Sequence, residues 1–186
     1  TAAIGISFAG SGPTLMGAAE RAGVVAKPNW NNATGAVSSG ALPLVDESGG
    51  ATASTATWSA AGVWMLPIAD GADNRRLMKG YLDTSSTSVT TVTVAGLASR
   101  LYDVYVYADG DNKPYDRSAA YTISGAGITT TTVNLTDPAN TNFDTTLTRA
   151  DGSVGNYVRF TITASGFTLT ATPTAATTAT RRAPVN

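Results

Sequence analysis

The chain has 186 residues, with 12 basic and 13 acidic side chains and a formal net charge of −1. This balance offers no basic surface to nucleic acid or to an anionic membrane. Cysteine and histidine are absent, which excludes disulfides, a cysteine nucleophile, the imidazole of a serine triad and the commonest transition-metal ligand. No apolar run approaches the ~20 residues of a membrane span, so we predict no membrane insertion.

Short runs rich in Thr, Val, Tyr and Phe alternate with Gly, Asn, Asp and Pro, which is typical of strands and tight turns. Leu15 to Ala22 is compatible with one or two helical turns. The predicted strands, in chain order, are Ile4–Ala9, Ala53–Ser59, Leu77–Leu82, Ser88–Val94, Tyr102–Ala108, Ala119–Ser124, Thr129–Leu135, Asp144–Thr148, Tyr157–Thr163 and Phe167–Thr172. We therefore expect an all-β fold, an antiparallel β-sandwich.

The last two predicted strands are separated by Ser165-Gly166, which favours an antiparallel hairpin. Alternation along its first strand predicts three inward side chains and two outward threonines. These are Val158, Phe160 and Ile162 on the inside, and Thr161 and Thr163 on the outside.

The end of the chain, from about 173 to 186, is rich in Thr and Ala and is expected to form a surface loop or tail. No repeat or linker divides the sequence. We therefore expect residues 1–186 to form one β-sandwich domain.

The segment 101–112 joins an alternating strand to a loop of carboxylates and an amide. Tyr102 should face the core, because the preceding Val94-Ala-Gly-Leu97 resembles a tyrosine corner. Tyr105 and Tyr107 then point to the opposite side. Exposed there, they would offer a stacking platform for a sugar ring. The alternative is that another strand, loop or domain covers them.

A second aromatic candidate is Trp30, which lies in Pro28-Asn-Trp-Asn-Asn32. One ring to stack and the amides of Asn31 and Asn32 to read hydroxyl groups would suit a sugar. The alternative is a Trp that closes the end of the sandwich while the amides satisfy loop backbone. Trp58 is expected in the core. Trp64 fits either role.

Acidic turns supply the candidate metal ligands. Asp109, Asp111 and Asn112 combine carboxylate and amide oxygens, the chemistry of a structural Ca²⁺ site. The competing interpretation is an ordinary turn in which these side chains cap their own backbone. Tyr115 lies in the same loop and would extend a ligand site.

We predict no enzymatic activity. A glycosidase needs two carboxyl groups roughly 5 to 10 Å apart, and the only glutamates are Glu20 and Glu47, both in loop-like sequence. Neither a Gly-x-Ser-x-Gly motif nor a phosphate-binding glycine loop occurs.

Four stretches carry a resemblance to a known group of proteins. These are Asn29-Trp-Asn-Asn32, Leu77-Met-Lys-Gly-Tyr-Leu-Asp83, Val92-Thr-Val-Ala-Gly-Leu97 and Tyr102-Asp-Val-Tyr-Val-Tyr107 with its Asp109-Gly-Asp-Asn112 loop. With them the chain resembles bacterial extracellular carbohydrate-binding modules of galactose-binding-like or jelly-roll fold. The resemblance implies a secreted or cell-surface location and a non-catalytic role, often with a structural calcium. It also implies a closing strand after a segment like Arg182-Ala-Pro-Val-Asn186.

Two functions follow as hypotheses. The first is a carbohydrate-binding module that tethers a protein to a polysaccharide through aromatic stacking and Asn/Asp hydrogen bonds. The expected ligand-binding residues are Trp30, Asn31, Asn32, Trp64, Tyr105, Tyr107 and Tyr115. The second is a structural subunit of an extracellular filament or surface layer, assembling through β-edges or termini with neighbouring domains or copies.

Overall fold

The computed structural model describes residues 2–12, 15–176 and 182–186. Its largest sheet has the strand order β10-β9-β8-β11-β7-β4-β3, and every neighbouring pair is antiparallel except β10 and β9. These strands are β3 (Leu42–Val45), β4 (Ala51–Ser59), β7 (Thr90–Tyr107), β8 (Arg117–Ser124), β9 (Thr131–Asp137), β10 (Ser153–Val154) and β11 (Tyr157–Pro173). The all-β sandwich class predicted from the sequence is confirmed.

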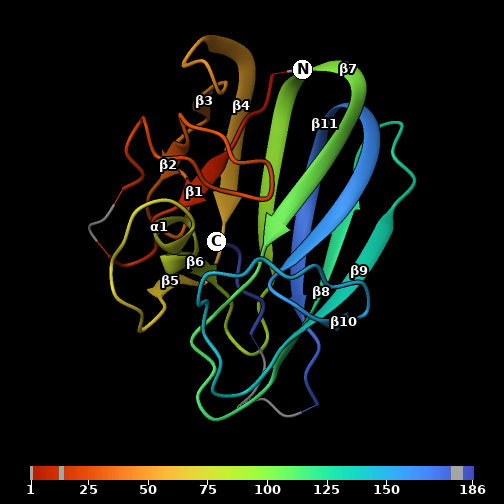
Figure 1. Cartoon of the computed structure of the whole chain (residues 1–186). Helices are drawn as coiled ribbons and strands as arrows, with labels where there is room; N and C mark the ends of the chain where they lie inside the picture. The colour runs from red at the N-terminus through yellow and green to blue at the C-terminus, as the bar shows by residue number, and fades with distance from the viewer. Residues whose placement is uncertain (1, 13–14, 177–181) are drawn as a thin grey trace.

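The two longest strands, β7 and β11, fold over together at one end of the molecule (Figure 1). Their ladder runs through the bend, with a register shift between Ala164 and Gly166. Gly96 makes the bend in β7 with a φ of 74°, and a Cβ there would collide with the carbonyl oxygen of Ala53. The Tyr102 hydroxyl donates a hydrogen bond to the Ala98 carbonyl at 2.6 Å. The predicted tyrosine corner therefore forms at this bend.

The predicted hairpin at Ser165-Gly166 is wrong. Both halves of β11 pair with β7 instead of with each other, because β7 bends at the same place. The predicted strands Ser88–Val94 and Tyr102–Ala108 are consequently the two arms of β7. The predicted strands Tyr157–Thr163 and Phe167–Thr172 are the two arms of β11. The first arm of β11 and the second arm of β7 form a front layer over the rest of the sheet (Figure 1).

The main core lies between these two layers. The inward side chains predicted for β11 are buried, and Thr161 and Thr163 are exposed, as expected. The front layer contributes Val106, Val158, Phe160 and Ile162, which belong to the same cluster as Trp58, Val92, Tyr121, Ile123 and Leu169 behind them. Burial of these side chains is what holds the fold over closed, at about 25 cal/mol per Å² of apolar surface.

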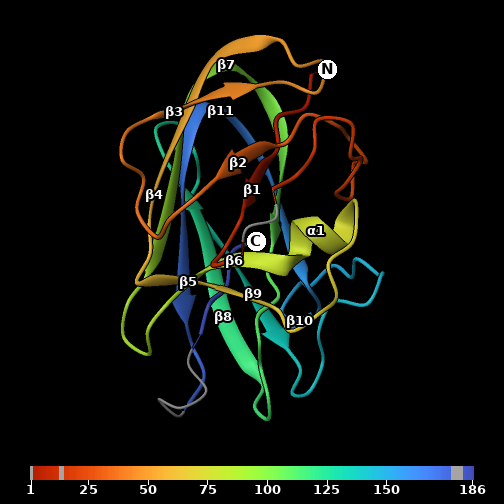
Figure 2. The ribbon, with the colours of Figure 1, turned by 90° about the vertical axis from the view of Figure 1, so that its left-hand side faces the viewer.

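The remaining elements cover one side of the sheet (Figure 2). β1 (Ile6–Phe8) pairs parallel with β2 (Asn31–Ala33), and β5 (Gly62–Met65) pairs antiparallel with β6 (Gly80–Asp83). Helix α1 (Asn74–Lys79) precedes β6 and buries Leu77 and Met78. β2, β3, β5 and β10 were not predicted. Pro43 is tolerated in β3 because β3 is an edge strand.

Three further predictions fail locally. The Leu77–Leu82 strand is helical up to Lys79, since Gly80 begins β6 where its backbone packs directly against Ala9. Asp144–Thr148 is an irregular loop without strand pairing, and Leu15–Ala22 contains a turn instead of helix. In each case the tertiary packing overrides a short local pattern.

The end of the chain is packed into the fold. Val185 forms an antiparallel bridge with Leu82, and the side chains from Ala183 to Asn186 are buried. The predicted tail is therefore wrong for 182–186, because these residues are held between β6 and the end of β7. Residues 177–181 of that prediction lie outside the described residues.

Candidate functional site

The first candidate site, around Trp30 and Tyr107, is closed. The two rings meet edge to face with centroids 6.2 Å apart. Trp30 Nε1 donates to the Lys27 carbonyl at 2.9 Å, and the Tyr107 hydroxyl accepts a hydrogen bond from Val24 N at 2.8 Å. Gly5 lies so close that a Cβ would come within 2.7 Å of the indole. Both side chains are buried, so neither offers a stacking face, in contrast to the sugar-binding hypothesis.

The amides beside Trp30 are occupied by backbone. Asn31 is buried; its Nδ2 donates to the carbonyls of Gly5 and Val45, and its Oδ1 accepts from Val45 N. Asn32 pairs with the backbone N–H and carbonyl of Met16 through its Oδ1 and Nδ2. All these donors and acceptors are already satisfied within the chain, so the geometry favours the alternative interpretation of both amides as loop anchors.

The other predicted aromatic residues do not form one platform. Tyr105 is half-buried against Tyr157, with ring centroids 6.2 Å apart, and Arg159 lies 6.0 Å from its ring centroid. Trp64 on β5 is 53% exposed and Tyr115 is 44% exposed. Among the described residues, no ring contact joins Trp64 or Tyr115 to the Tyr105 cluster.

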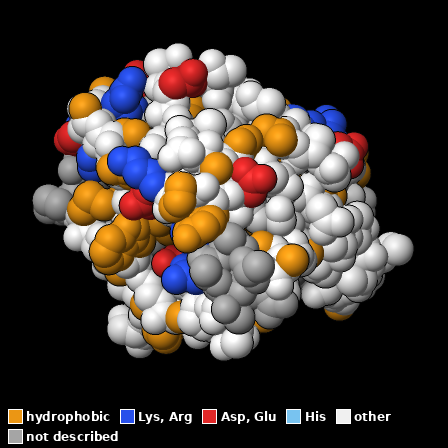
Figure 3. Space-filling model, turned by 90° about the horizontal axis from the view of Figure 1, so that it is seen from below, with side chains coloured by type: hydrophobic (Ala, Val, Ile, Leu, Met, Phe, Trp, Pro, Cys, Tyr) orange, Lys and Arg blue, Asp and Glu red, His pale blue; other side chains and the backbone are white. Residues whose placement is uncertain are grey.

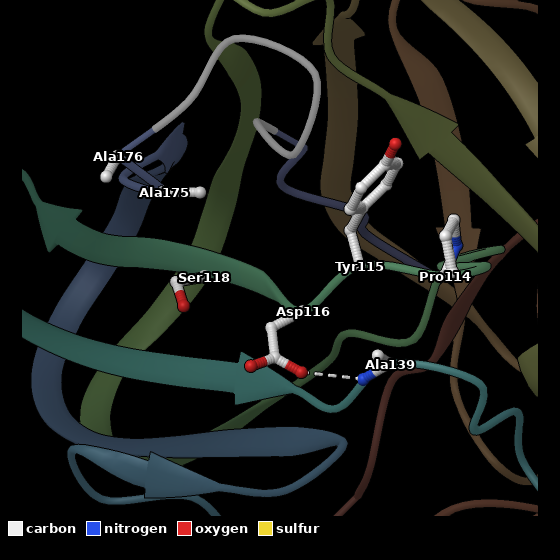
Figure 4. A pocket seen from close by; sticks show the side chains of 7 residues that line it. All are labelled: Pro114, Tyr115, Asp116, Ser118, Ala139, Ala175 and Ala176. Atoms are coloured by element: carbon white, nitrogen blue, oxygen red, sulfur yellow. Dashed lines mark hydrogen bonds between the residues drawn. The ribbon is translucent and has the colours of Figure 1, made fainter.

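Tyr115 borders a pocket of about 400 Å³. Figure 4 shows Tyr115 and Ala175 on opposite sides of it, with Asp116 and Ser118 between them. Asp116 Oδ1 accepts a hydrogen bond from Ala139 N at 2.8 Å, which ties the loop after β7 to the loop after β9. The pocket brings one exposed ring, one carboxylate and one hydroxyl together, a small set of polar contacts for a sugar.

The predicted metal ligands lie where the front layer ends. Asp109 and Asn112 are buried and Asp111 is half-buried. Across residues 2–12, 15–176 and 182–186, no group of three or more His, Cys, Asp or Glu side chains is placed to hold a metal ion. A site here would need amide or backbone oxygens in addition to carboxylates.

A second hollow, larger than the pocket beside Tyr115, was not predicted from the sequence. It is an open groove of about 700 Å³ beside the second arm of β7, which we call the β7 groove. Its lining includes residues 2–6, parts of β3 and β4, both arms of β7 and the second arm of β11. Members that line it include Ile4, Val25, Leu44, Val94, Leu101 and Phe167.

One side of the β7 groove is an unpaired strand edge. Residues 100–107 pair only with β11, and no other described strand pairs with them. The Tyr107 carbonyl accepts from Asn186 N at 3.1 Å, whereas Ala108 N donates towards the β11 side, to Asn156 O. Backbone groups alternate in direction along an antiparallel strand. Leu101, Asp103 and Tyr105 therefore present their N–H and carbonyl groups to the groove, as Tyr107 does.

The charged groups at the groove largely have partners. Asp103 accepts from Arg159 at 2.8 Å and from Thr161 at 2.8 Å, and these bonds lower the pKa of its carboxyl. Lys27 Nζ donates to the Pro28 carbonyl and lies 4.7 Å from the Trp30 ring centroid. Burial lowers the pKa of Lys27 to about 8, against the opposing charges of Glu47 and Asp46.

The face of the molecule seen from below carries few charged side chains (Figure 3). Seen from below (Figure 3), the hydrophobic, acidic and basic side chains gather on one half, whereas the other half is mostly uncharged. Within the part of the chain that the structure describes, no helix has the length and apolar character required to cross a bilayer.

Comparison with models of known protein families gave no match, and searches of curated proteins and of solved structures gave none either. The sequence missed the β7 groove because a groove depends on which strand edges remain unpaired. The one local signal was the Val94-Ala-Gly-Leu97 bend, which separates the two arms of β7.

Proposed function

We propose that the protein is a non-catalytic structural module of a secreted or surface protein, and that an extended strand of a neighbouring polypeptide completes its front layer. The observation that carries the proposal is the unpaired edge of residues 100–107 beside the apolar β7 groove. An added strand would gain main-chain hydrogen bonds from the edge and apolar contacts from the groove, as in β-strand addition.

The edge lacks the usual protection against strand pairing. Sheets usually protect their edges with Lys, Pro, bulges or very short strands. Residues 100–107 contain no Lys or Pro, and the register with β11 is regular between 157 and 164. Eight residues span ~26 Å at about 3.3 Å each. Leu101 is 65% exposed beside this edge, which supports a partner with apolar side chains.

A hydrogen bond within the chain marks the place where an added strand would begin to pair with this edge. Asn186 N already donates to the Tyr107 carbonyl at the free edge. Val185 and Asn186 line one end of the β7 groove, and Gly96, Leu97 and Ala98 line the other. A strand laid along the edge would continue this hydrogen bond into a ladder towards Leu101.

The test is hydrogen exchange at single amides, combined with peptide binding. The free amides of Leu101, Asp103 and Tyr105 should exchange fast, whereas those of Tyr102 and Val104, which face β11, should be protected. A Val-Thr-Val-Thr-Val-Thr peptide should protect the first set with a Kd of about 0.1 to 1 mM. If instead high protein concentration alone protects them, a second copy supplies the strand. Fast exchange under both conditions overturns the proposal.

A matched pair of variants separates the edge from general surface effects. Leu101→Lys places a charge at the β7 groove, and Val154→Lys makes the same kind of change at exposed β10, an edge strand that does not line the groove. Strand binding should weaken at least ~10-fold in the first variant, because the bound strand would cover the lysine ammonium, which must then lose its water. Equal binding by both variants would contradict the proposed location.

Carbohydrate binding is a second candidate, and we place it in the pocket beside Tyr115. The observation that favours it is the exposed Tyr115 ring next to Asp116 and Ser118 (Figure 4). Affinity electrophoresis on cellulose, xylan, mannan and pectin tests it, with Tyr115→Ala as the variant and Trp64→Ala as the control. Retention that is lost only in Tyr115→Ala supports a sugar site, and absence of retention on all four polymers excludes it.

A further inference from the structure

Two loops are joined tightly at the end of the sandwich, and they carry buried carboxylates. One follows β7 and contains Asp109 and Asn112; the other follows β9, which ends at Asp137. Gly110 N donates to Asp137 Oδ2 at 3.2 Å, and Asn112 Nδ2 donates to the Pro138 carbonyl. Asp109 and Asp137 are each 3% exposed and Asn112 is fully buried. The two carboxylates are thus brought close together away from water.

This arrangement is costly for two negative charges. The ion pairs of the described residues include neither Asp109 nor Asp137. Burial raises the pKa of both carboxyls, and the charge of Asp109 raises that of Asp137 further. Asp144 adds a like charge near Asp109, whereas Arg117 partly offsets the charge of Asp137. Buried carboxylates normally require a counter-charge or hydrogen bonds to each oxygen. Asp137 accepts one hydrogen bond at each oxygen, from Gly110 N and from Thr141 Oγ1 at 3.4 Å, whereas Asp109 Oδ1 accepts none.

Several oxygens in the same loops also have no hydrogen-bond partner. The buried atoms of this kind are Asp109 Oδ1, Asp111 Oδ1, Asn112 Oδ1 and Asn142 Oδ1. Asn112 is the most informative, because its Nδ2 is bonded to the second loop while its fully buried Oδ1 is left unsatisfied between the loops. Buried polar atoms without partners are rare in folded proteins. Four buried oxygens that accept no hydrogen bond, two of them on carboxylates, favour a cation here.

We propose that Asp109 and Asp137, together with the amide oxygen of Asn112, bind a Ca²⁺ ion between the two loops. Oxygen donors from carboxylates, amides and backbone suit this ion, which accepts six to eight ligands in flexible geometry. The absence of His and Cys from the chain disfavours zinc. Asn142 and Asp111 offer further oxygens. The site differs from the sequence prediction in its second carboxylate, Asp137, which is 28 positions after Asp109 and joins it only in the folded chain.

A bound Ca²⁺ would neutralise the carboxylate pair and clamp the loops after β7 and β9 to each other. This role is independent of the β7 groove, so either proposal can fail alone. Tyr81 offers a built-in reporter, because its hydroxyl accepts a hydrogen bond from Asp111 N at 3.0 Å. A lanthanide at the site would lie close enough to this ring for energy transfer.

The experiment titrates the whole chain with Tb³⁺ and then with Ca²⁺. Excitation of tyrosine should produce Tb³⁺ luminescence that Ca²⁺ displaces. Thermal unfolding at pH 7.5 should move up by at least ~5 °C from EDTA to saturating Ca²⁺. Mg²⁺ should give a smaller shift, since it prefers octahedral sites with several waters.

Variants test the ligands. Asp109→Asn and Asp137→Asn should each abolish the Ca²⁺-dependent rise, yet melt higher than the unsubstituted chain in EDTA because the charge repulsion is removed. Asp151→Asn, at an exposed position in the second loop, should keep the full Ca²⁺ response. A chain that shows neither Tb³⁺ luminescence nor a Ca²⁺-dependent melting shift would overturn the proposal and leave a shared proton as the resolution of the charge pair.

Discussion

Asn31→Asp is the sharpest test of whether the amides beside Trp30 serve the fold or a ligand. The substitution keeps the size of the side chain and the oxygen that accepts from Val45 N. It replaces the amide donor that now serves two carbonyls, those of Gly5 at 2.9 Å and Val45 at 3.0 Å. A carboxylate would instead face both carbonyl oxygens in a buried position.

The expected cost follows from these contacts. Two net hydrogen bonds at about 1 kcal/mol each, plus the penalty of unsatisfied buried carbonyls, give a loss of about 3 kcal/mol. For a chain of this length that corresponds to a fall in Tm of about 10 °C. Urea unfolding measures it, with Asn134→Asp on the exposed face of β9 as the control for the same chemical change. A loss below ~1 kcal/mol, or lost glycan binding at unchanged stability, would refute the reasoning.

Two other outcomes follow from the described contacts. Tyr102→Phe removes the hydrogen bond to the Ala98 carbonyl and should lower the free energy of unfolding by about 1 kcal/mol, whereas Tyr115→Phe should not change it. No effect of Tyr102→Phe in urea unfolding would show that the corner bond is not stabilising. In EDTA, stability should fall as pH rises from about 4 to 8. Burial raises the pKa of Asp109 to about 7 and of Asp137 to about 8, so the folded state holds protons that the unfolded state has released. Unfolding followed across that pH range in Asp137→Asn should show a shallower slope, and an unchanged slope would contradict the assignment.

The strand content was predictable because alternation is a local property. The arms of β7 and β11 were each recognised, and the inward and outward faces of 158–163 were assigned correctly from period two alone. The tyrosine corner was predictable for the same reason, since Tyr102 and Ala98 are only four residues apart. Helix α1 was missed because six residues are too few to establish a 3.6-residue period.

The binding candidates were harder to predict, because exposure depends on what covers a residue. Trp30, Asn31 and Tyr107 have the side chains of a sugar site, yet residues from distant parts of the chain bury them. Conversely, the free edge of β7 has an unremarkable sequence, and it is open only because no described strand lies beside it. Neither property can be derived from residue type or spacing.

The sequence by itself determined the all-β class, the inward and outward faces of residues 158–163 and the tyrosine corner at Tyr102, because short-range sterics and alternation govern them. It also excluded chemistry that needs His or Cys. Only the tertiary structure decided which aromatic rings are covered, that Asp137 joins Asp109, and that one edge of β7 remains unpaired beside a groove. These outcomes depend on contacts between residues far apart in the chain, whose geometry is set by packing.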